Sequence, residues 1–343
     1  MGYIRFPTDH MQAVSSSYLI PIMNRCVMTN QQKIYFRVDG NSTIGAGHIV
    51  RCVSIAQEAE AQGSKAVFVS SNEESAKILR KYNFEPLLIG GDLKNFDRLD
   101  AQKLADAMNG NTSVLVDSYG VTDEFFDACV DLGLKVAYID DMYTFETGSL
   151  SDPVRRNVRV LINYGFGFTE EDYEKVYEGT DTKLLIGPKY APVRKVFREK
   201  AGQYRVRGKV ENVLITTGST NPNKSLEKMA QGCRDALSYA HISVVVGPNA
   251  SFDNSLVSKL NLHLVKDVTD LSDHMLGSDL VISAAGTTLY ELYTLGVPTI
   301  AVPIVENQLA NAKGYEKTGI GKALIATAWD SIDVAKLVGD FLV

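Results

Sequence analysis

Strands rich in valine, isoleucine and leucine alternate with helical stretches along most of this chain, and this alternation constrains its fold more than any other feature. Short apolar runs such as KIYFRVD (33–39) are each followed by an amphipathic stretch, for example GHIVRCVSIAQEAEAQG (47–63). Buried strands that alternate with helices of about 10–15 residues indicate parallel βαβ units. The chain is therefore predicted to be an α/β protein with open, doubly wound sheets of the Rossmann type.

The alternation runs through the chain twice. It breaks at residues 188–210, a basic segment with two prolines, and restarts with VENVLITTG (210–218). A break of this kind is typical of a domain junction. We therefore expect two Rossmann-like domains, residues 33–190 and 191–343. Ligands of open α/β sheets bind at the carboxyl ends of the strands, so the expected site is a cleft that the two domains face.

The first 32 residues do not follow this pattern. SSSYLIPIM (15–23) has a short apolar core, but it lacks the small-residue cleavage site of a secretory signal. We expect residues 1–32 to be an N-terminal extension or a disordered arm. No apolar run approaches the roughly 20 residues that a membrane helix needs, so no membrane partner is predicted.

Charge and cysteine content narrow the function classes. The net charge of −6 argues against a nucleic-acid binder, which usually carries a basic patch. The four cysteines are widely scattered and none shows C-x-x-C spacing, so neither a zinc site nor a redox pair is predicted. Free thiols in a long α/β chain favour a reducing, cytoplasmic compartment. No metal or cofactor is expected, and the sequence is compatible with a monomer.

The turn in RVDGNSTIGAGHIVRC (37–52) contains G-x-G but lacks the third glycine of a dinucleotide fingerprint. Gly45 and Gly47 would let the backbone approach a ligand, and the following helix would direct free N–H groups at an anion such as a diphosphate. His48 stands where this helix starts. A helix N-terminus disfavours a cationic imidazole, and a neutral imidazole can act as a base near pH 7. The alternative is a capping or packing histidine.

Polar residues follow three of the predicted strands. Because the carboxyl ends of parallel strands meet at one edge of a sheet, these residues could form a sugar-binding rim. The alternative is that the aspartates cap the helices that follow. The residues are Asp117, Ser118, Tyr119, Asp140, Asp141 and Asn163.

Two turns in the second half could bind phosphate. ITTGST (215–220) is a strand followed by a turn whose backbone N–H groups could line a phosphate. In VISAAGTTLYELYTLGVPTIAVPIVENQLANA (281–312), a strand delivers Ser283 and a small-residue turn opens a helix. Thr287 and Thr288 could cap this helix and also contact an anion.

Three further polar residues of this stretch suit other parts of a nucleotide. Glu291 lies one helical turn beyond the threonines, where a carboxylate would repel a phosphate but would accept hydrogen bonds from ribose hydroxyls. Asn307 and Gln308 return to the same edge of the sheet after the next strand. Together these features make residues 281–312 the most specific stretch in the chain.

At these residues the sequence resembles the two-domain nucleotide-sugar enzymes of the GT-B fold. Residues 281–312 look like the UDP-holding segment of the N-acetylglucosamine transferases of peptidoglycan synthesis. The N-terminal turn, with Asp39, G-x-G-H and Arg51, is similar to that of the UDP-sugar hydrolases of pseudaminic acid synthesis. VDSYG, GPKYAPVRKVF and TTGSTNP match further segments of those hydrolases, although Ser219 stands where a second glycine is common. The resemblance runs from about residue 33 to the end.

The resemblance implies hydrolysis of a UDP-2,4-diacetamido-2,4,6-trideoxyhexose to UDP and the free sugar, on a route to glycosylated flagellin or surface polysaccharide. Water would attack the anomeric carbon with inversion, and His48 would be the general base. UDP is a good leaving group, so no covalent nucleophile and no metal would be required. Asp39 and Tyr119 would be catalytic together with His48, and with Asn307 they would orient the sugar or the water.

The resemblance also assigns residues to the substrate. Backbone amides would stabilise the departing diphosphate, Glu291 would take the ribose hydroxyls, and main chain near Val268 would bind the uracil edge. The expected substrate-binding and UDP-binding residues are Gly45, Gly47, Arg51, Gly218, Ser219, Val268, Ser283, Gly286, Thr287, Thr288, Glu291, Asn307 and Gln308.

Two alternatives remain open from the sequence. A GT-B glycosyltransferase would use the same UDP site with an acceptor hydroxyl in place of water. A non-catalytic nucleotide-sugar binding protein would bind the same ligand without turnover.

Overall fold

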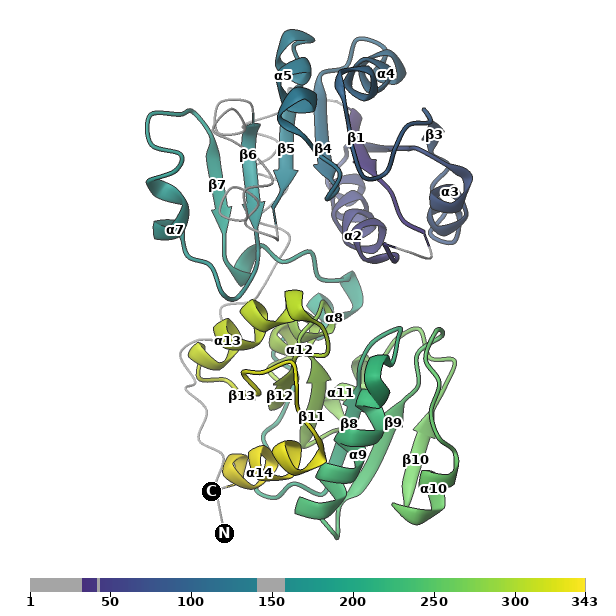
Figure 1. The fold of residues 1–343 in the computed structure, drawn as a ribbon, viewed down its shortest axis with the longest axis vertical. Helices are drawn as coiled ribbons and strands as arrows, with labels where there is room; N and C mark the ends of the chain where they lie inside the picture. Colours follow the sequence, from purple (N-terminus) through teal and green to yellow (C-terminus); the bar gives the residue numbers. More distant parts are fainter. Residues whose placement is uncertain (1–32, 42–43, 141–157, 343) are drawn as a thin grey trace. The chain divides into compact units, whose positions relative to one another are not determined.

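The structure is a computed structural model that describes residues 33–41, 44–140 and 158–342 (Figure 1). The expected N-terminal extension and Asp141 lie outside these residues. The described residues form two compact units. The N-terminal unit extends to residue 164 and includes 168–192, and the C-terminal unit consists of 165–167 and 193–342. The chain thus enters the second unit briefly at 165–167, which no sequence pattern indicated.

The N-terminal unit is built on a parallel sheet of seven strands in the order β3-β2-β1-β4-β5-β6-β7. The strands are β1 (Lys33–Val38), β2 (Lys65–Ser70), β3 (Leu87–Leu88), β4 (Ser113–Asp117), β5 (Lys135–Ile139), β6 (Val158–Asn163) and β7 (Lys183–Ile186). The helices are α2 (Gly47–Ala61), α3 (Glu73–Arg80), α4 (Arg98–Met108), α5 (Asp123–Asp131) and α7 (Glu170–Glu174).

The C-terminal unit has a parallel sheet of six strands in the order β10-β9-β8-β11-β12-β13. The strands are β8 (Asn212–Thr216), β9 (His241–Val245), β10 (Leu262–Val265), β11 (Leu280–Ala284), β12 (Thr299–Val302) and β13 (Lys322–Ala323). The helices are α8 (Lys195–Glu199), α9 (Ser225–Ala236), α10 (Ser255–Lys259), α11 (Ser272–Leu276), α12 (Thr288–Leu295), α13 (Leu309–Lys317) and α14 (Ser331–Phe341).

Local sequence explains where these elements begin and why they pack. Asn72, Asp97 and Thr122 start α3, α4 and α5 by accepting hydrogen bonds from backbone N–H groups of the first turn. The central strands are buried because both faces of each sheet are covered, so their side chains are apolar throughout. Each unit has its own apolar core. The predicted α/β class with two doubly wound sheets is confirmed.

The strand order places two turns of each sheet at a topological switch point. In the N-terminal sheet the chain moves outward from β1 to β3 and then returns to β4, which lies on the other side of β1. In the C-terminal sheet the same reversal occurs between β8 and β11. Because ligands of such sheets bind where the order reverses, the loops that follow β1, β4, β8 and β11 are the expected binding regions. Within the described residues, no helix is long and apolar enough to span a membrane.

Candidate functional site

The first candidate site lies at the switch point of the N-terminal sheet, where β1 and β4 end side by side. Val38 pairs with Asp117 in the strand register, so Asp39 lies next to the turn after β4. His48 is the second residue of α2, and only 6% of its surface is exposed. Gly45 adopts a φ of +77° in the turn that leads into α2, a conformation that favours glycine.

The three residues predicted to be catalytic line one cavity. His48, Asp39 and Tyr119 surround a space of about 90 Å³. A water in the liquid occupies about 30 Å³, so the cavity has room for a few waters or a small part of a ligand. The remaining lining residues are Ile44, Leu93, Lys94, Asp117, Ser118 and Gly120.

The His48 imidazole is held from two sides. Its Nδ1 atom lies 2.6 Å from Oδ1 of Asp117, and its ring meets the ring of Tyr119 edge-on with centroids 4.5 Å apart. Asp117 is fully buried. Burial by itself would raise the pKa of Asp117, but the charge of Arg51 and the contacts with Arg51 and His48 outweigh it and hold that pKa well below its usual range. Asp117 therefore contacts His48 as a carboxylate and does not cap a helix.

Arg51 points into the protein from the next turn of α2. Its Nε donates to Oδ2 of Asp117 at 2.5 Å, a second guanidinium nitrogen donates to Oδ1, and the third donates to the Tyr164 hydroxyl at 2.7 Å. The guanidinium is buried. We expected Arg51 to contact the substrate, but its donors are directed at Asp117 and Tyr164.

Asp39 is fixed by its neighbours. Its carboxylate forms an ion pair with buried Arg37 and accepts hydrogen bonds from the backbone N–H and the hydroxyl of Ser71, at 2.7 and 3.0 Å. The hydroxyl of Ser75 donates to it at 3.1 Å. Asp39 therefore contributes a rigid, charge-compensated wall to the cavity.

The other predicted members of the polar rim lie apart from His48. Asp140 and Asn163 are buried, and both contact the hydroxyl of Tyr173, at 3.3 and 2.7 Å. These residues hold the ends of β5 and β6 in the core, so the structure does not gather them with the cavity.

The second candidate site lies at the switch point of the C-terminal sheet. After β8, Gly218 has a φ of +80°, and its N–H donates to the hydroxyl of Thr216 at 3.2 Å. Ser219 is exposed, and its carbonyl accepts a hydrogen bond from the N–H of Asn249 at 2.9 Å. A side chain at Gly247 would overlap the carbonyl oxygen of Gly218. The turn is thus held in place from behind by the loop after β9.

The turn after β11 leads into α12. Ser283 is fully buried and its hydroxyl donates to the carbonyl of Ala284 at 3.0 Å, so it is not presented to a ligand. The helix begins at Thr288 after Thr287, but the Thr287 side chain makes no capping hydrogen bond. The predicted cap is therefore wrong, because Thr287 already has helical φ and ψ angles. The first N–H groups of a helix lack intrahelical acceptors, which suits an anion at this position.

Gln308 follows β12 in the chain, and its side chain lies close to the same turn. Its Oε1 accepts a hydrogen bond from the N–H of Ile304 at 3.1 Å, and a side chain at Gly286 would come within 3.3 Å of its Nε2. The glycine thus lets the Gln308 amide lie close to the turn. Asn307 is exposed next to it.

Arg194 links Glu291 of α12 to the loop that contains Val268. Oε1 of Glu291 accepts a hydrogen bond from Nε of Arg194 at 2.6 Å, and Arg194 also donates to the carbonyl of Thr269 at 2.9 Å. Burial raises the pKa of Glu291, and Arg194 offsets this only in part. Val268 is 37% exposed in this loop. Arg194 was not among the predicted site residues, because a lone arginine in a basic junction carries no spacing signal.

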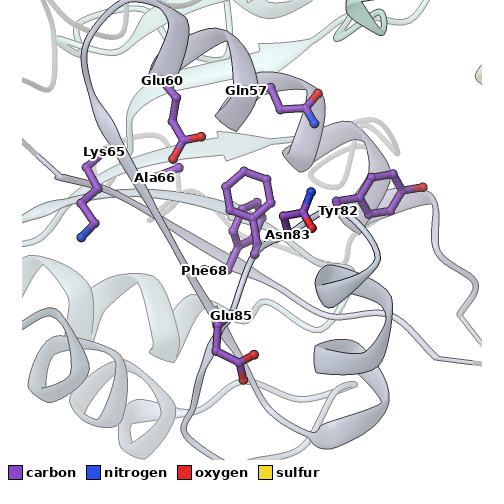
Figure 2. Close-up of a pocket in the computed structure, with 9 residues that line it drawn as sticks. Gln57, Glu60, Lys65, Ala66, Phe68, Tyr82, Asn83 and Glu85 are labelled. Atoms are coloured by element: carbon purple, nitrogen blue, oxygen red, sulfur yellow. The ribbon is translucent and has the colours of Figure 1, made fainter.

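A larger pocket of about 450 Å³ lies elsewhere in the N-terminal unit. Figure 2 shows it beside the start of β2, with Lys65, Phe68, Glu60 of α2 and Glu85 among its walls. In a parallel sheet the start of β2 lies at the amino edge, opposite to the edge where His48 lies. Ligand sites of such sheets are at the carboxyl edge, so this pocket is not the candidate site.

Comparison with known proteins relates both halves of the chain to nucleotide-sugar enzymes. Residues 212–338 match the glycosyltransferase family 28 C-terminal domain. An uncharacterised protein of Methanocaldococcus jannaschii is 24% identical over 81% of this chain and 56% of its own length. A Helicobacter pylori protein is 24% identical over 82% of this chain and 46% of its own length. That protein is named pseudaminic acid cytidylyltransferase and UDP-2,4-diacetamido-2,4,6-trideoxy-beta-L-altropyranose hydrolase.

Solved structures identify the fold. MurG of Acinetobacter baumannii superposes with a TM-score of 0.61 at 16% identity, covering 91% of this chain and 92% of that one. The predicted resemblance to the GT-B fold is confirmed, since the chain shares the fold of this glycosyltransferase. The chain spans about half the length of the curated relatives it matches.

Proposed function

We propose that this protein is a hydrolase that cleaves a UDP-2,4-diacetamido-2,4,6-trideoxyhexose to UDP and the free sugar, in the cytoplasmic synthesis of pseudaminic acid or a related nonulosonic acid. The observation that carries this proposal is the small cavity that His48, Asp39 and Tyr119 line together. The similarity to the Helicobacter pylori protein over 82% of the chain supports the choice of substrate and reaction.

The reaction needs one base and a stabilised leaving group. A water oxygen bonds to the anomeric carbon while His48 removes the proton of that water. The bond from the anomeric carbon to the diphosphate oxygen breaks, and its electron pair leaves with UDP. Because attack and departure occur on opposite faces of the carbon, the product has the inverted configuration. The cavity of about 90 Å³ beside His48 is large enough for the water.

The C-terminal unit supplies the nucleotide site in this proposal. The N–H groups at the start of α12 and the amide of Gln308 would bind the diphosphate, since both lie at the turn after β11. Glu291 would accept hydrogen bonds from the ribose hydroxyls, because a carboxylate has about four acceptor positions and Arg194 takes only some of them. The match of residues 212–338 to a glycosyltransferase domain supports a nucleotide-sugar ligand here.

A GT-B glycosyltransferase is the second candidate, and the same match to a glycosyltransferase domain favours it. In that reaction an acceptor hydroxyl would take the place of water, and His48 would deprotonate the hydroxyl instead. The two candidates therefore share every residue of the site and differ in the nucleophile. A binding protein without turnover would keep only the nucleotide site.

Incubating the full chain with a panel of UDP-diacetamido-trideoxyhexoses, without any acceptor, tests the proposal. We expect stoichiometric release of UDP and free sugar, followed by ³¹P and ¹H NMR. Release only after an acceptor is added would identify a transferase. Binding of the UDP-sugar with no release under either condition would identify a binding protein.

A further inference from the structure

We propose that Asp117 and Arg51 form a fixed pair that holds His48 in the tautomer with its proton on Nδ1, so that Nε2 is the atom that accepts a proton from water. This inference rests on the proposed function, since it names the basic atom of that reaction. Asp117 and Arg51 are positioning residues here, because they act on the substrate only through His48.

The short contact between His48 and Asp117 determines the tautomer. Nδ1 lies 2.6 Å from Oδ1 of a fully buried carboxylate. An ionised carboxylate only accepts hydrogen bonds, so Nδ1 must carry the hydrogen. In the other neutral tautomer, a lone pair on Nδ1 would face this negatively charged oxygen. The Arg51 nitrogen that lies 3.0 Å from Nδ1 would not offset that repulsion, because the same nitrogen already donates to Oδ1 of Asp117 over a shorter distance. Nε2 is then the ring nitrogen with the free lone pair.

Arg51 fixes the carboxylate in this orientation. It donates to both oxygens of Asp117 in the two-pronged geometry that suits an arginine and a carboxylate. One of its nitrogens also lies 3.0 Å from Nδ1 of His48, because it and the imidazole converge on the same oxygen. The Tyr164 hydroxyl accepts from the third guanidinium nitrogen and holds Arg51 from behind. Neither Asp117 nor His48 can therefore turn without breaking these bonds.

Among the charges around His48, the carboxylate of Asp117 is the one that directly stabilises the protonated imidazole. The negative charge of Asp39 is balanced by Arg37, and that of Asp117 by Arg51. The helix N-terminus opposes a positive charge on His48, and the adjacent carboxylate counteracts that effect. Among the residues that the structure describes, the following titratable and charged groups face His48 or its pair: Arg51 and Cys52 of α2, Asp117 and Tyr119 at the end of β4, Asp39 after β1, Lys94, and Tyr164 after β6.

The proton path follows from this arrangement. Nε2 takes a proton from water as the water oxygen bonds to the anomeric carbon and the diphosphate leaves with the electron pair. His48 becomes an imidazolium that donates through Nδ1 to Asp117, and Asp117 stays ionised. Nε2 afterwards releases its proton to solvent, which restores the neutral ring. The buried thiol of Cys52, whose Sγ lies 3.5 Å from Oδ2 of Asp117, takes no part.

The tautomer can be measured without substrate, so its test is independent of the proposed function. Long-range ¹H–¹⁵N correlation spectra of the uniformly labelled full chain report the protonation of each imidazole nitrogen. The signals of His48 among the five histidines are assigned with His48→Gln. At pH 8 we expect Nδ1 to be protonated and Nε2 to be unprotonated. A spectrum with the proton on Nε2 overturns the inference.

Kinetics of Asp117→Asn test the role of the carboxylate. We expect kcat to fall by about 10²–10⁴-fold with KM within a few-fold, and the acid limb of the kcat/KM profile to move to lower pH. Asp279→Asn is the matched control, because Asp279 is also buried and paired with an arginine, Arg207, but within the described part of the chain it is not hydrogen-bonded to a histidine. It should lower stability without moving the acid limb.

The outcomes separate the two proposals. An Asp117→Asn enzyme with near-normal kcat and an unmoved acid limb overturns the role of Asp117. If this variant does not fold, the ¹H–¹⁵N spectrum of the wild-type protein, which reports the tautomer of His48, tests the inference by itself. Wild-type protein that hydrolyses no UDP-sugar but shows His48 with Nδ1 protonated contradicts the proposed function alone.

Discussion

The atoms that act on a sugar nucleotide in this account belong to residues far apart in the sequence. His48 and Asp117 are 69 positions apart, and they meet because β1 and β4 are neighbours in the sheet. A histidine after a glycine-bearing turn could be selected as a candidate base from the sequence. Its partner could not, because Asp117 looked like any polar residue at a strand end. Only the strand order identifies which of those residues contacts His48.

Glu291 gives a prediction at the same scale. Glu291→Ala should raise the Kd for UDP by about 10- to 100-fold, because hydrogen bonds to a charged group contribute about 1.5–3 kcal/mol. Isothermal titration with UDP measures the change. Glu316→Ala in α13 is the control, since that carboxylate contacts the N–H of Ala323 and not the predicted UDP site.

The ribose can be separated from the rest of the nucleotide in this measurement. With 2′,3′-dideoxy-UDP, wild type and Glu291→Ala should bind equally, because the hydroxyl partners are absent. An equal loss of affinity for both nucleotides would mean that Glu291 acts by holding Arg194 and the loop that contains Val268 instead.

At the scale of elements, the turns at the strand ends form the candidate site. The sequence indicated the positions of these turns, but it did not indicate the contacts that hold them in place. Gly45 and Gly218 lie in the turns that the sequence predicted, and both have positive φ angles. The threonine cap of α12 is absent, because the Thr287 backbone is already helical and its side chain cannot reach the N–H groups as a cap does. Side-chain capping depends on backbone angles that a residue type does not specify.

The loop after β9 supports the turn after β8, and this contact can be tested. Gly247→Ala should displace the turn, because the added Cβ would overlap the Gly218 carbonyl oxygen. We expect a lower Tm and weaker UDP binding, measured by calorimetry. Gly339→Ala is the matched control in α14, where a Cβ meets nothing within 4 Å. The control should stabilise the protein by about 0.5–1 kcal/mol, and a Gly247→Ala protein that behaves in the same way would contradict the contact.

For the whole molecule, the alternation of strands and helices was sufficient to predict two doubly wound sheets. It could not predict that residues 165–167 join the C-terminal unit. There the ring of Phe166 stacks on that of Tyr290 at 4.7 Å, and a side chain at Gly314 would overlap the Phe166 backbone. This packing depends on the shapes of segments that are more than 120 residues apart in sequence, so no local pattern indicates it.

Buried carboxylates in both units make stability depend on pH. The charge of Arg51 and the contacts with His48 lower the pKa of Asp117 despite burial, and backbone N–H groups with Arg207 do so for Asp279. A carboxyl group whose folded pKa lies below its unfolded value of about 3.9 stabilises the fold above that value, and this contribution is lost as pH falls. Glu291 acts in the opposite sense because its pKa is raised.

Urea unfolding at pH 7, 5 and 3.5 measures this dependence. The single tryptophan, Trp329, lies in the C-terminal unit and reports its unfolding by fluorescence. We expect the free energy of unfolding of this unit to fall less between pH 5 and 3.5 in Asp279→Asn than in wild type. An unchanged difference would show that Asp279 does not carry the acid sensitivity.

One measurement tests the central claim most directly. The full chain is incubated with the UDP-diacetamido-trideoxyhexose in H₂¹⁸O without an acceptor, and the products are followed by NMR and mass spectrometry. The account predicts UDP without ¹⁸O, free sugar of inverted configuration with ¹⁸O at the anomeric carbon, and turnover about 10²–10⁴-fold lower in His48→Asn with UDP binding kept. Retained configuration, ¹⁸O in UDP, or a His48→Asn enzyme within a few-fold of wild type would contradict it.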